Sequence, residues 1–100
     1  TAPANDNEYV DDRAESDLAW ELADAVSPLL TDRDRSRFYA AIGSGESYTA
    51  IDTALQTMAR QRAPISSELI TKLTDWLGAY THSADAPRLR RLLRAIESMP

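Results

Sequence analysis

Four arginines near the C-terminal end are the densest group of side chains that could do chemistry. Arg88, Arg90, Arg91 and Arg94 lie within the segment RLRRLLRAI, residues 88–96. A guanidinium group binds carboxylates and phosphates through paired hydrogen bonds. The chain has 100 residues and a net charge of −5, so this basic group stands out against an acidic background. It predicts one possible binding surface, for an anionic ligand or partner.

The same spacing also fits a solvated helix face. On a helical wheel the apolar residues of this segment fall within about 100°: Leu89, Leu92, Leu93 and Ile96. The arginines spread over about 160° on the opposite side, as an amphipathic helix requires. We therefore expect this face to be mainly solvent-exposed. Arg88 differs, because the helix dipole disfavours a cation in the first turn. Asp85, the acidic N-terminal segment or an external anion could compensate its charge.

Acidic residues gather at the other end of the chain. Residues 1–30 contain eight acids and one base, whereas residues 31–100 contain eight acids and ten bases. We expect residues 1–10 to form a flexible acidic N-terminal arm and residues 11–100 to form the folded domain. An acidic arm within the screening length of about 8–10 Å would partly neutralise the arginine face.

The residue types offer few side chains that could bind a metal or a cofactor or act as catalytic groups. The chain contains no cysteine, one histidine (His82) and three glycines, which leaves no thiolate site and no glycine-rich phosphate loop. The segment Asp32–Ser36 begins like a calcium loop, but Arg37 and Gly43 occupy the positions that require glycine and glutamate. We expect no metal, no cofactor and no enzymatic activity.

Hydrophobic periodicity predicts an all-α fold, a single small bundle of four to five short helices. The expected helices begin near Asp11 or Asp12, after the caps Thr31 and Ser66, near Ser47, and after Asp85. The expected helix ends are marked by Pro28, Gly43 and Pro64. The carboxylates of the first helix are expected to point mostly outward.

The two tryptophans have different expected places. Trp76 lies in the middle of the apolar stripe of the fourth helix and is predicted to be in the core. Trp20 lies about 200° from Leu18 on the wheel of the first helix. Either a second element covers Trp20, which the pattern favours, or Trp20 faces a partner, since exposed aromatic residues are enriched at interfaces.

The charge pattern argues against a nucleic-acid ligand, because the exposed side of residues 66–80 has more acid than base and the pI is near 4.7. Ten of the eleven basic residues are arginine, which is typical of GC-rich bacterial genomes. No segment has the length of apolar residues needed to cross a membrane, and the lack of cysteine suits the cytoplasm.

The sequence therefore predicts a small cytosolic helical protein that acts as a non-catalytic protein–protein interaction module. The alternative is a binder of an anionic ligand, a metabolite or less readily nucleic acid, through the Arg88–Arg94 helix face. The candidate interaction residues are Trp20, Arg88, Arg90, Arg91 and Arg94.

Overall fold

The computed structural model describes residues 12–63, 65–80 and 82–97, and within these ranges it contains five α-helices and no strand. The elements are α1 (Asp12–Val26), the 3₁₀ turn η2 (Ser27–Leu29), α2 (Asp32–Gly43), α3 (Ser47–Gln61), α4 (Ser67–Gly78) and α5 (Ala86–Glu97). The predicted all-α bundle is confirmed. The predicted arm at residues 1–10 lies outside the described residues.

Two of the predicted caps start their helices as expected. The first backbone N–H groups of a helix have no partner within the helix, so a side-chain oxygen that accepts from one of them stabilises the start. Thr31 Oγ1 accepts from the N–H of Asp34 at 3.1 Å, and Ser66 Oγ accepts from the N–H of Leu69 at 3.1 Å. Pro28 also acts as predicted, since α1 gives way to η2 just before it.

The end of α3 differs from the prediction. We expected Pro64 to close this helix, but it ends at Gln61 because Arg62 adopts the left-handed conformation, with φ of 55°. The chain then turns back on the helix, and the N–H of Ala63 donates to the carbonyl of Met58 at 3.0 Å. A left-handed residue of this kind is a common helix terminator, although glycine is usual there. The direction of the connection to α4 therefore depends on Arg62.

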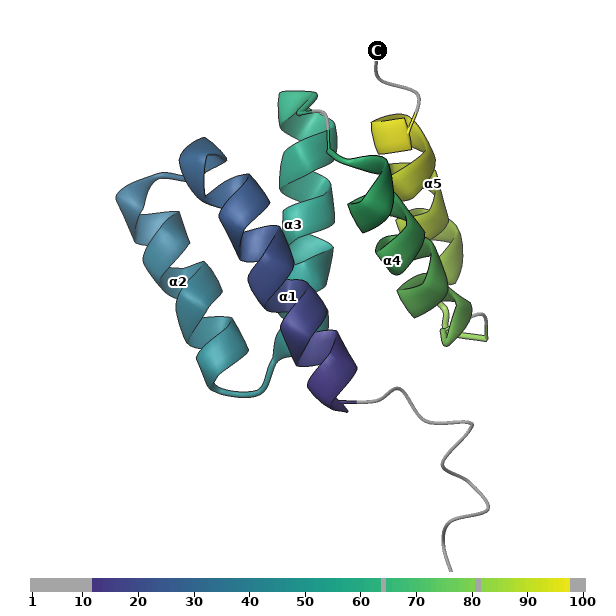
Figure 1. Ribbon diagram of the computed structural model, residues 1–100, viewed down its shortest axis with the longest axis horizontal. Coiled ribbons are helices and arrows are strands. Elements are labelled where there is room, and N and C mark those ends of the chain that lie inside the picture. The colour runs from purple at the N-terminus through teal and green to yellow at the C-terminus, as the bar shows by residue number, and fades with distance from the viewer. Residues whose placement is uncertain (1–11, 64, 81, 98–100) are drawn as a thin grey trace, which may run out of the picture.

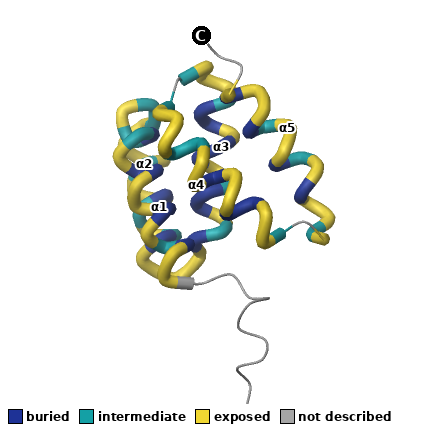
Figure 2. Tube along the Cα trace, turned by 45° about the vertical axis from the view of Figure 1, so that its right-hand side comes forward, coloured by how far each residue is buried: buried dark blue, intermediate teal, exposed yellow. Residues whose placement is uncertain are grey.

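Helix α3 lies at the centre of the bundle, where it packs against α1, α2 and α5 (Figure 1). Helix α4 packs against α5 and α1. Buried positions line the inward sides of the helices, with α1 and α2 on one side of the molecule and α5 on the opposite side (Figure 2). The largest fully buried side chains come mostly from α1, α3 and α5: Leu22, Val26, Ile51, Leu55, Thr57, Met58, Leu73, Leu89 and Ile96. None of the described helices has the length and apolar character that crossing a bilayer demands.

Trp76 lies in the core, as predicted, with 7% of its surface exposed. Its Nε1–H donates to Glu15 Oε2 at 2.8 Å, and the hydroxyl of Tyr80 donates to the same oxygen at 2.5 Å. Tyr48 packs against both of these rings. Asp17, Glu21 and Asp24 are exposed, as expected for most carboxylates of the first helix, and Glu15 is the buried exception. The carboxylate links α1 to α4.

Trp76→Ala is expected to lower the free energy of unfolding by about 3–5 kcal/mol, because it removes a large buried side chain and leaves a cavity. Chemical denaturation followed by circular dichroism measures this loss. The matched control is Trp20→Ala, which removes a side chain that is 44% exposed and should cost much less. A loss below about 1 kcal/mol for Trp76→Ala would contradict its place in the core.

Candidate functional site on helix α5

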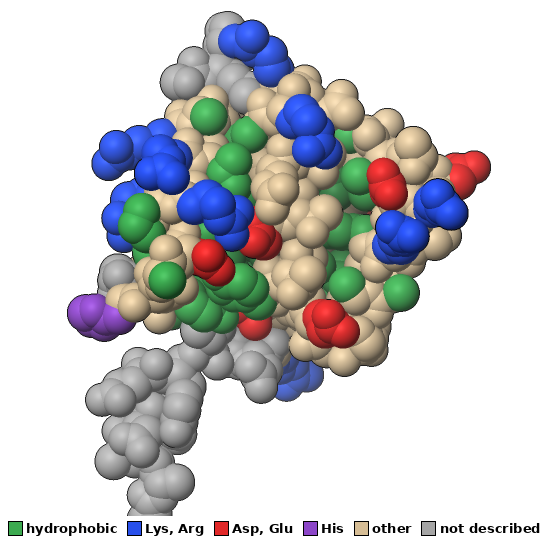
Figure 3. Space-filling view, turned by 180° about the vertical axis from the view of Figure 1, so that it is seen from behind, with side chains coloured by type: hydrophobic (Ala, Val, Ile, Leu, Met, Phe, Trp, Pro, Cys, Tyr) green, Lys and Arg blue, Asp and Glu red, His purple; other side chains and the backbone are tan. Residues whose placement is uncertain are grey.

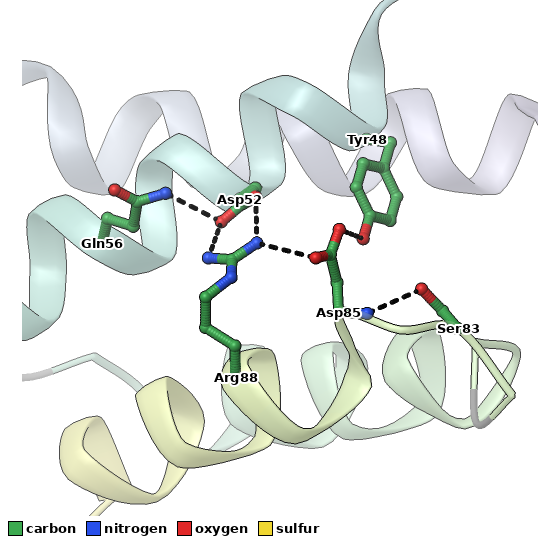
Figure 4. Close-up of polar contacts among 6 residues, drawn as sticks. All are labelled: Tyr48, Asp52, Gln56, Ser83, Asp85 and Arg88. Carbon is green, nitrogen blue, oxygen red and sulfur yellow. Dashed lines mark hydrogen bonds and ion pairs between the residues drawn. The ribbon is translucent and has the colours of Figure 1, made fainter.

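Arg88 connects the first turn of α5 to the middle of α3. Its Nη1 and Nη2 donate to Asp52 Oδ1 and Oδ2 at 2.9 and 2.7 Å, so the pair is bidentate (Figure 4). Asp85 Oδ1 lies 3.7 Å from Nη2 of the same guanidinium. The unfavourable cation in the first turn is therefore compensated within the protein, by Asp85 as one prediction suggested and more closely by Asp52.

The ion pair belongs to a larger polar network between α3 and the start of α5 (Figure 4). Gln56 Nε2 donates to Asp52 Oδ1 at 3.0 Å, and the Tyr48 hydroxyl donates to Asp85 Oδ2 at 3.2 Å. The hydrogen bonds from Arg88 lower the pKa of Asp52 below its ordinary value, despite partial burial. Burial, followed by the hydrogen bond to Asp85, raises the pKa of Tyr48. The network holds the guanidinium of Arg88 against α3.

Asp52 is the residue of this network that sequence reasoning missed. It lies on α3, 36 positions before Arg88. The sequence contained one indication of its role. Asp52 is next to Ile51 and four residues after Tyr48, so it lies at the edge of the apolar stripe of α3. An acid at that edge meets whichever helix packs alongside. The periodicity of α3 does not reveal which helix that is.

The other three arginines of α5 are exposed, and none of them forms an ion pair with a described residue. Basic side chains gather along the edge of the molecule that α5 forms (Figure 3). Arg90 and Arg94 line an open groove of about 310 Å³ between α4 and α5. Arg91 is not part of this groove. The predicted candidates on α5 therefore separate into one half-buried residue that is paired with α3, two groove residues and one outer residue.

The groove combines charge with an apolar floor. Leu77 of α4 and Leu93 of α5 line it beneath the two arginines, and Gly78 leaves it open because nothing lies within 4 Å of the position a Cβ would take. Arg90 and Arg94 are one helical turn apart, so both side chains extend from the same side of α5. Such a surface can bind carboxylates while it covers apolar side chains from a partner.

A second groove, of about 340 Å³, lies between α2 and α3. Arg37 and Arg60 line it, but Asp34 lies among them and reduces its positive charge. Three threonines along α3 form much of its wall: Thr49, Thr53 and Thr57. Both grooves are lined by two arginines and one acid, but α5 carries the further exposed Arg91, so the α5 face is the stronger candidate for an anion.

Trp20 does not join the arginine face. It lies on α1 and stacks against Tyr39 of α2, with ring centroids 5.6 Å apart and planes inclined by 30°. Tyr39 therefore covers part of the ring, but the favoured prediction that a second element covers Trp20 holds only in part. Trp20 is still 44% exposed and is the one exposed large hydrophobic side chain in the part of the chain that the structure describes. It keeps a surface that a partner can cover.

Comparisons with protein-family models, with curated proteins and with solved structures found no match to this chain.

Asp52→Asn is expected to lower the free energy of unfolding by about 1–2 kcal/mol at neutral pH, because it weakens a charge-assisted pair that is partly exposed. The folded pKa of Asp52 lies below its ordinary value of 3.8. The pair therefore contributes fully above that value, and its contribution is lost as pH falls through the lowered pKa. Urea denaturation at several pH values should show wild type and variant converging below pH 3.8.

The matched control for this measurement is Asp75→Asn on α4, an exposed carboxylate that forms no ion pair with a described residue. Its stability difference from wild type should be small at neutral pH. A difference between wild type and Asp52→Asn that stays constant across the acid range would show that the ion pair does not stabilise the fold.

Proposed function

We propose that this chain is a non-catalytic protein–protein interaction module that binds an acidic segment of a partner in the groove between α4 and α5. One observation carries the proposal. Arg90 and Arg94 are exposed, form no ion pair with a described residue, and line a groove whose floor contains Leu77 and Leu93. Protein interfaces combine apolar contacts with arginine anchors in this way.

The composition of the groove favours a protein segment over nucleic acid. Glu97 lies at the groove beside Arg94, and Asp75 is exposed on α4 next to the groove residue Thr74. These carboxylates would repel a continuous phosphate backbone. A peptide segment with separate acidic and apolar side chains can place the acidic ones against the two arginines and the apolar ones against the two leucines.

The state of the Thr74 hydroxyl, which lies at this groove, supports a non-catalytic role. The Thr74 hydroxyl donates to the carbonyl of Ile70 at 2.9 Å and is not activated by a base among the described residues. His82, which is exposed, lies in the connection before α5 and is not among the groove residues. The proposal includes a cytoplasmic location, which the lack of cysteine suits.

A compact anionic metabolite is the second candidate ligand. Two guanidinium groups one turn apart can bind a single phosphate or carboxylate together. The apolar floor gives such a ligand nothing further to contact, so this candidate uses only part of the groove.

The test is a titration of the isotope-labelled chain with a synthetic amphipathic peptide that alternates glutamate and leucine, followed by amide chemical shifts. We expect shifts in α4 and α5 around Leu77 and Leu93. Arg90→Ala with Arg94→Ala should weaken binding at least about tenfold, since each removes a charge-assisted contact. Arg33→Ala, an exposed arginine on α2, is the control and should change nothing.

Two further probes decide between the candidates. The same peptide with glutamine in place of glutamate should bind more weakly, and equal binding would contradict a role for the arginines. Inorganic phosphate should bind weakly. Phosphate that binds as tightly as the acidic peptide, at the same residues, would favour the metabolite.

A further inference from the structure

Charge is unevenly distributed over the folded part of the chain, although the net charge of this part is small. Residues 12–97 carry thirteen acids and eleven bases. Helix α1 contains five acids and one base, whereas α5 contains four arginines and one acid. These two helices lie on opposite sides of the molecule, with α3 and α4 between them (Figure 2). One side is therefore acidic and the other basic.

The outer face of α1 presents two carboxylates around an aromatic ring. Asp17 and Asp24 lie three and four residues from Trp20, so all three side chains share one face of the helix. Both aspartates are exposed and neither forms an ion pair with a described residue. Glu21 is different, because it binds Lys72 of α4 at 2.7 Å. The face formed by Asp17, Trp20 and Asp24, called here the acidic face, is thus free to bind.

We propose that the acidic segment received by the groove between α4 and α5 is the acidic face of α1 from a second copy of this chain. In this arrangement Trp20 lies against the apolar floor at Leu77 and Leu93. Asp17 and Asp24 bind Arg90 and Arg94 on either side of the ring. The inference rests on the proposed function, because it uses the same groove and names its occupant.

The dimensions of the two surfaces are compatible. Asp17 and Asp24 are about 10.5 Å apart along the α1 axis, and Arg90 and Arg94 about 6 Å apart along α5, at 1.5 Å per residue. The long arginine side chains can span the difference. The ring of Trp20 is already held by its stacking on Tyr39, so less of its side-chain freedom is lost on binding.

The contact joins two different surfaces, so it is a heterologous, head-to-tail contact. Each bound copy keeps its second surface free and can receive another copy. The result is a ring if the rotation between copies closes and an open chain if it does not. Because the ion pairs lie at the edge of the contact, salt should weaken the association.

Sedimentation velocity of the full chain at low salt, over a range of concentrations, tests this directly. One variant carries Asp17→Lys and Asp24→Lys, which blocks the acidic face, and the other carries Arg90→Glu and Arg94→Glu, which blocks the groove. We expect wild type to associate with rising concentration and each variant alone to stay monomeric. A mixture of the two should associate again, because the native pair of surfaces remains between the two variants and the reversed surfaces, lysine against glutamate, also attract each other.

The control carries the same types of charge reversal elsewhere, Glu68→Lys on α4 and Arg33→Glu on α2, and should associate like wild type. Trp20→Ser should weaken the association at least tenfold with little change in the melting temperature. Thermal melts of every variant show whether it is folded. If a doubly reversed variant is unfolded, Asp17→Asn with Asp24→Asn and Arg90→Gln with Arg94→Gln replace it, with reduced association expected for each.

Three outcomes would overturn the inference. They are a wild-type chain that stays monomeric at millimolar concentration and low salt, a blocked variant that still self-associates, or a mixture of blocked variants that does not. The proposed function is judged separately. If wild type is monomeric but the acidic peptide binds the groove, only the self-association fails, whereas loss of peptide binding removes the proposed function as well.

Discussion

The bidentate pair between Arg88 and Asp52 determines how the rest of α5 faces its surroundings. On the wheel of α5, Arg88 lies about 40° beyond one edge of the apolar stripe, Arg90 lies about 60° beyond the other edge, and Arg94 lies about 40° further round than Arg90. The bond from Arg88 to α3 and the burial of Leu89, Leu93 and Ile96 together restrict rotation of α5 about its axis, with Arg90 and Arg94 on the side next to α4. The groove arginines are thus positioned by an arginine that takes no part in the groove.

Glu15 provides the corresponding polar contact on the other side of α3. A buried carboxylate is costly unless donors satisfy it, and here the Trp76 indole and the Tyr80 hydroxyl do so. Both donors come from the α4 region, so α1 and α4 must meet in one register for the bonds to form. Apolar packing alone tolerates small sliding of helices. These two polar contacts, one at Glu15 and one at Arg88, restrict it on both sides of the bundle.

Local signals in the sequence predicted most of the fold, and non-local contacts account for what it could not predict. The Thr31 and Ser66 caps, the break at Pro28 and the burial of Trp76 depend on residues within a few positions of each other. The Asp52–Arg88 and Glu15–Trp76 bonds join residues 36 and 61 positions apart. The groove depends on how α4 and α5 pack together. The first-turn position of Arg88 could therefore be recognised from the sequence, but its pairing with Asp52 and the separation of Arg90 and Arg94 from Arg91 could not.

Arg62 has a consequence for how readily the chain accepts substitutions. A side chain in the left-handed region carries a conformational cost of about 1–2 kcal/mol that glycine would not. The arginine offsets part of that cost, because a cation at the C-terminal end of α3 interacts favourably with the helix dipole. A β-branched residue there would keep the full cost and lose the charge. Substitutions at Arg62 should therefore differ in their effect on stability: glycine and asparagine should fit the left-handed conformation, whereas valine or isoleucine should destabilise the connection although the side chain is exposed.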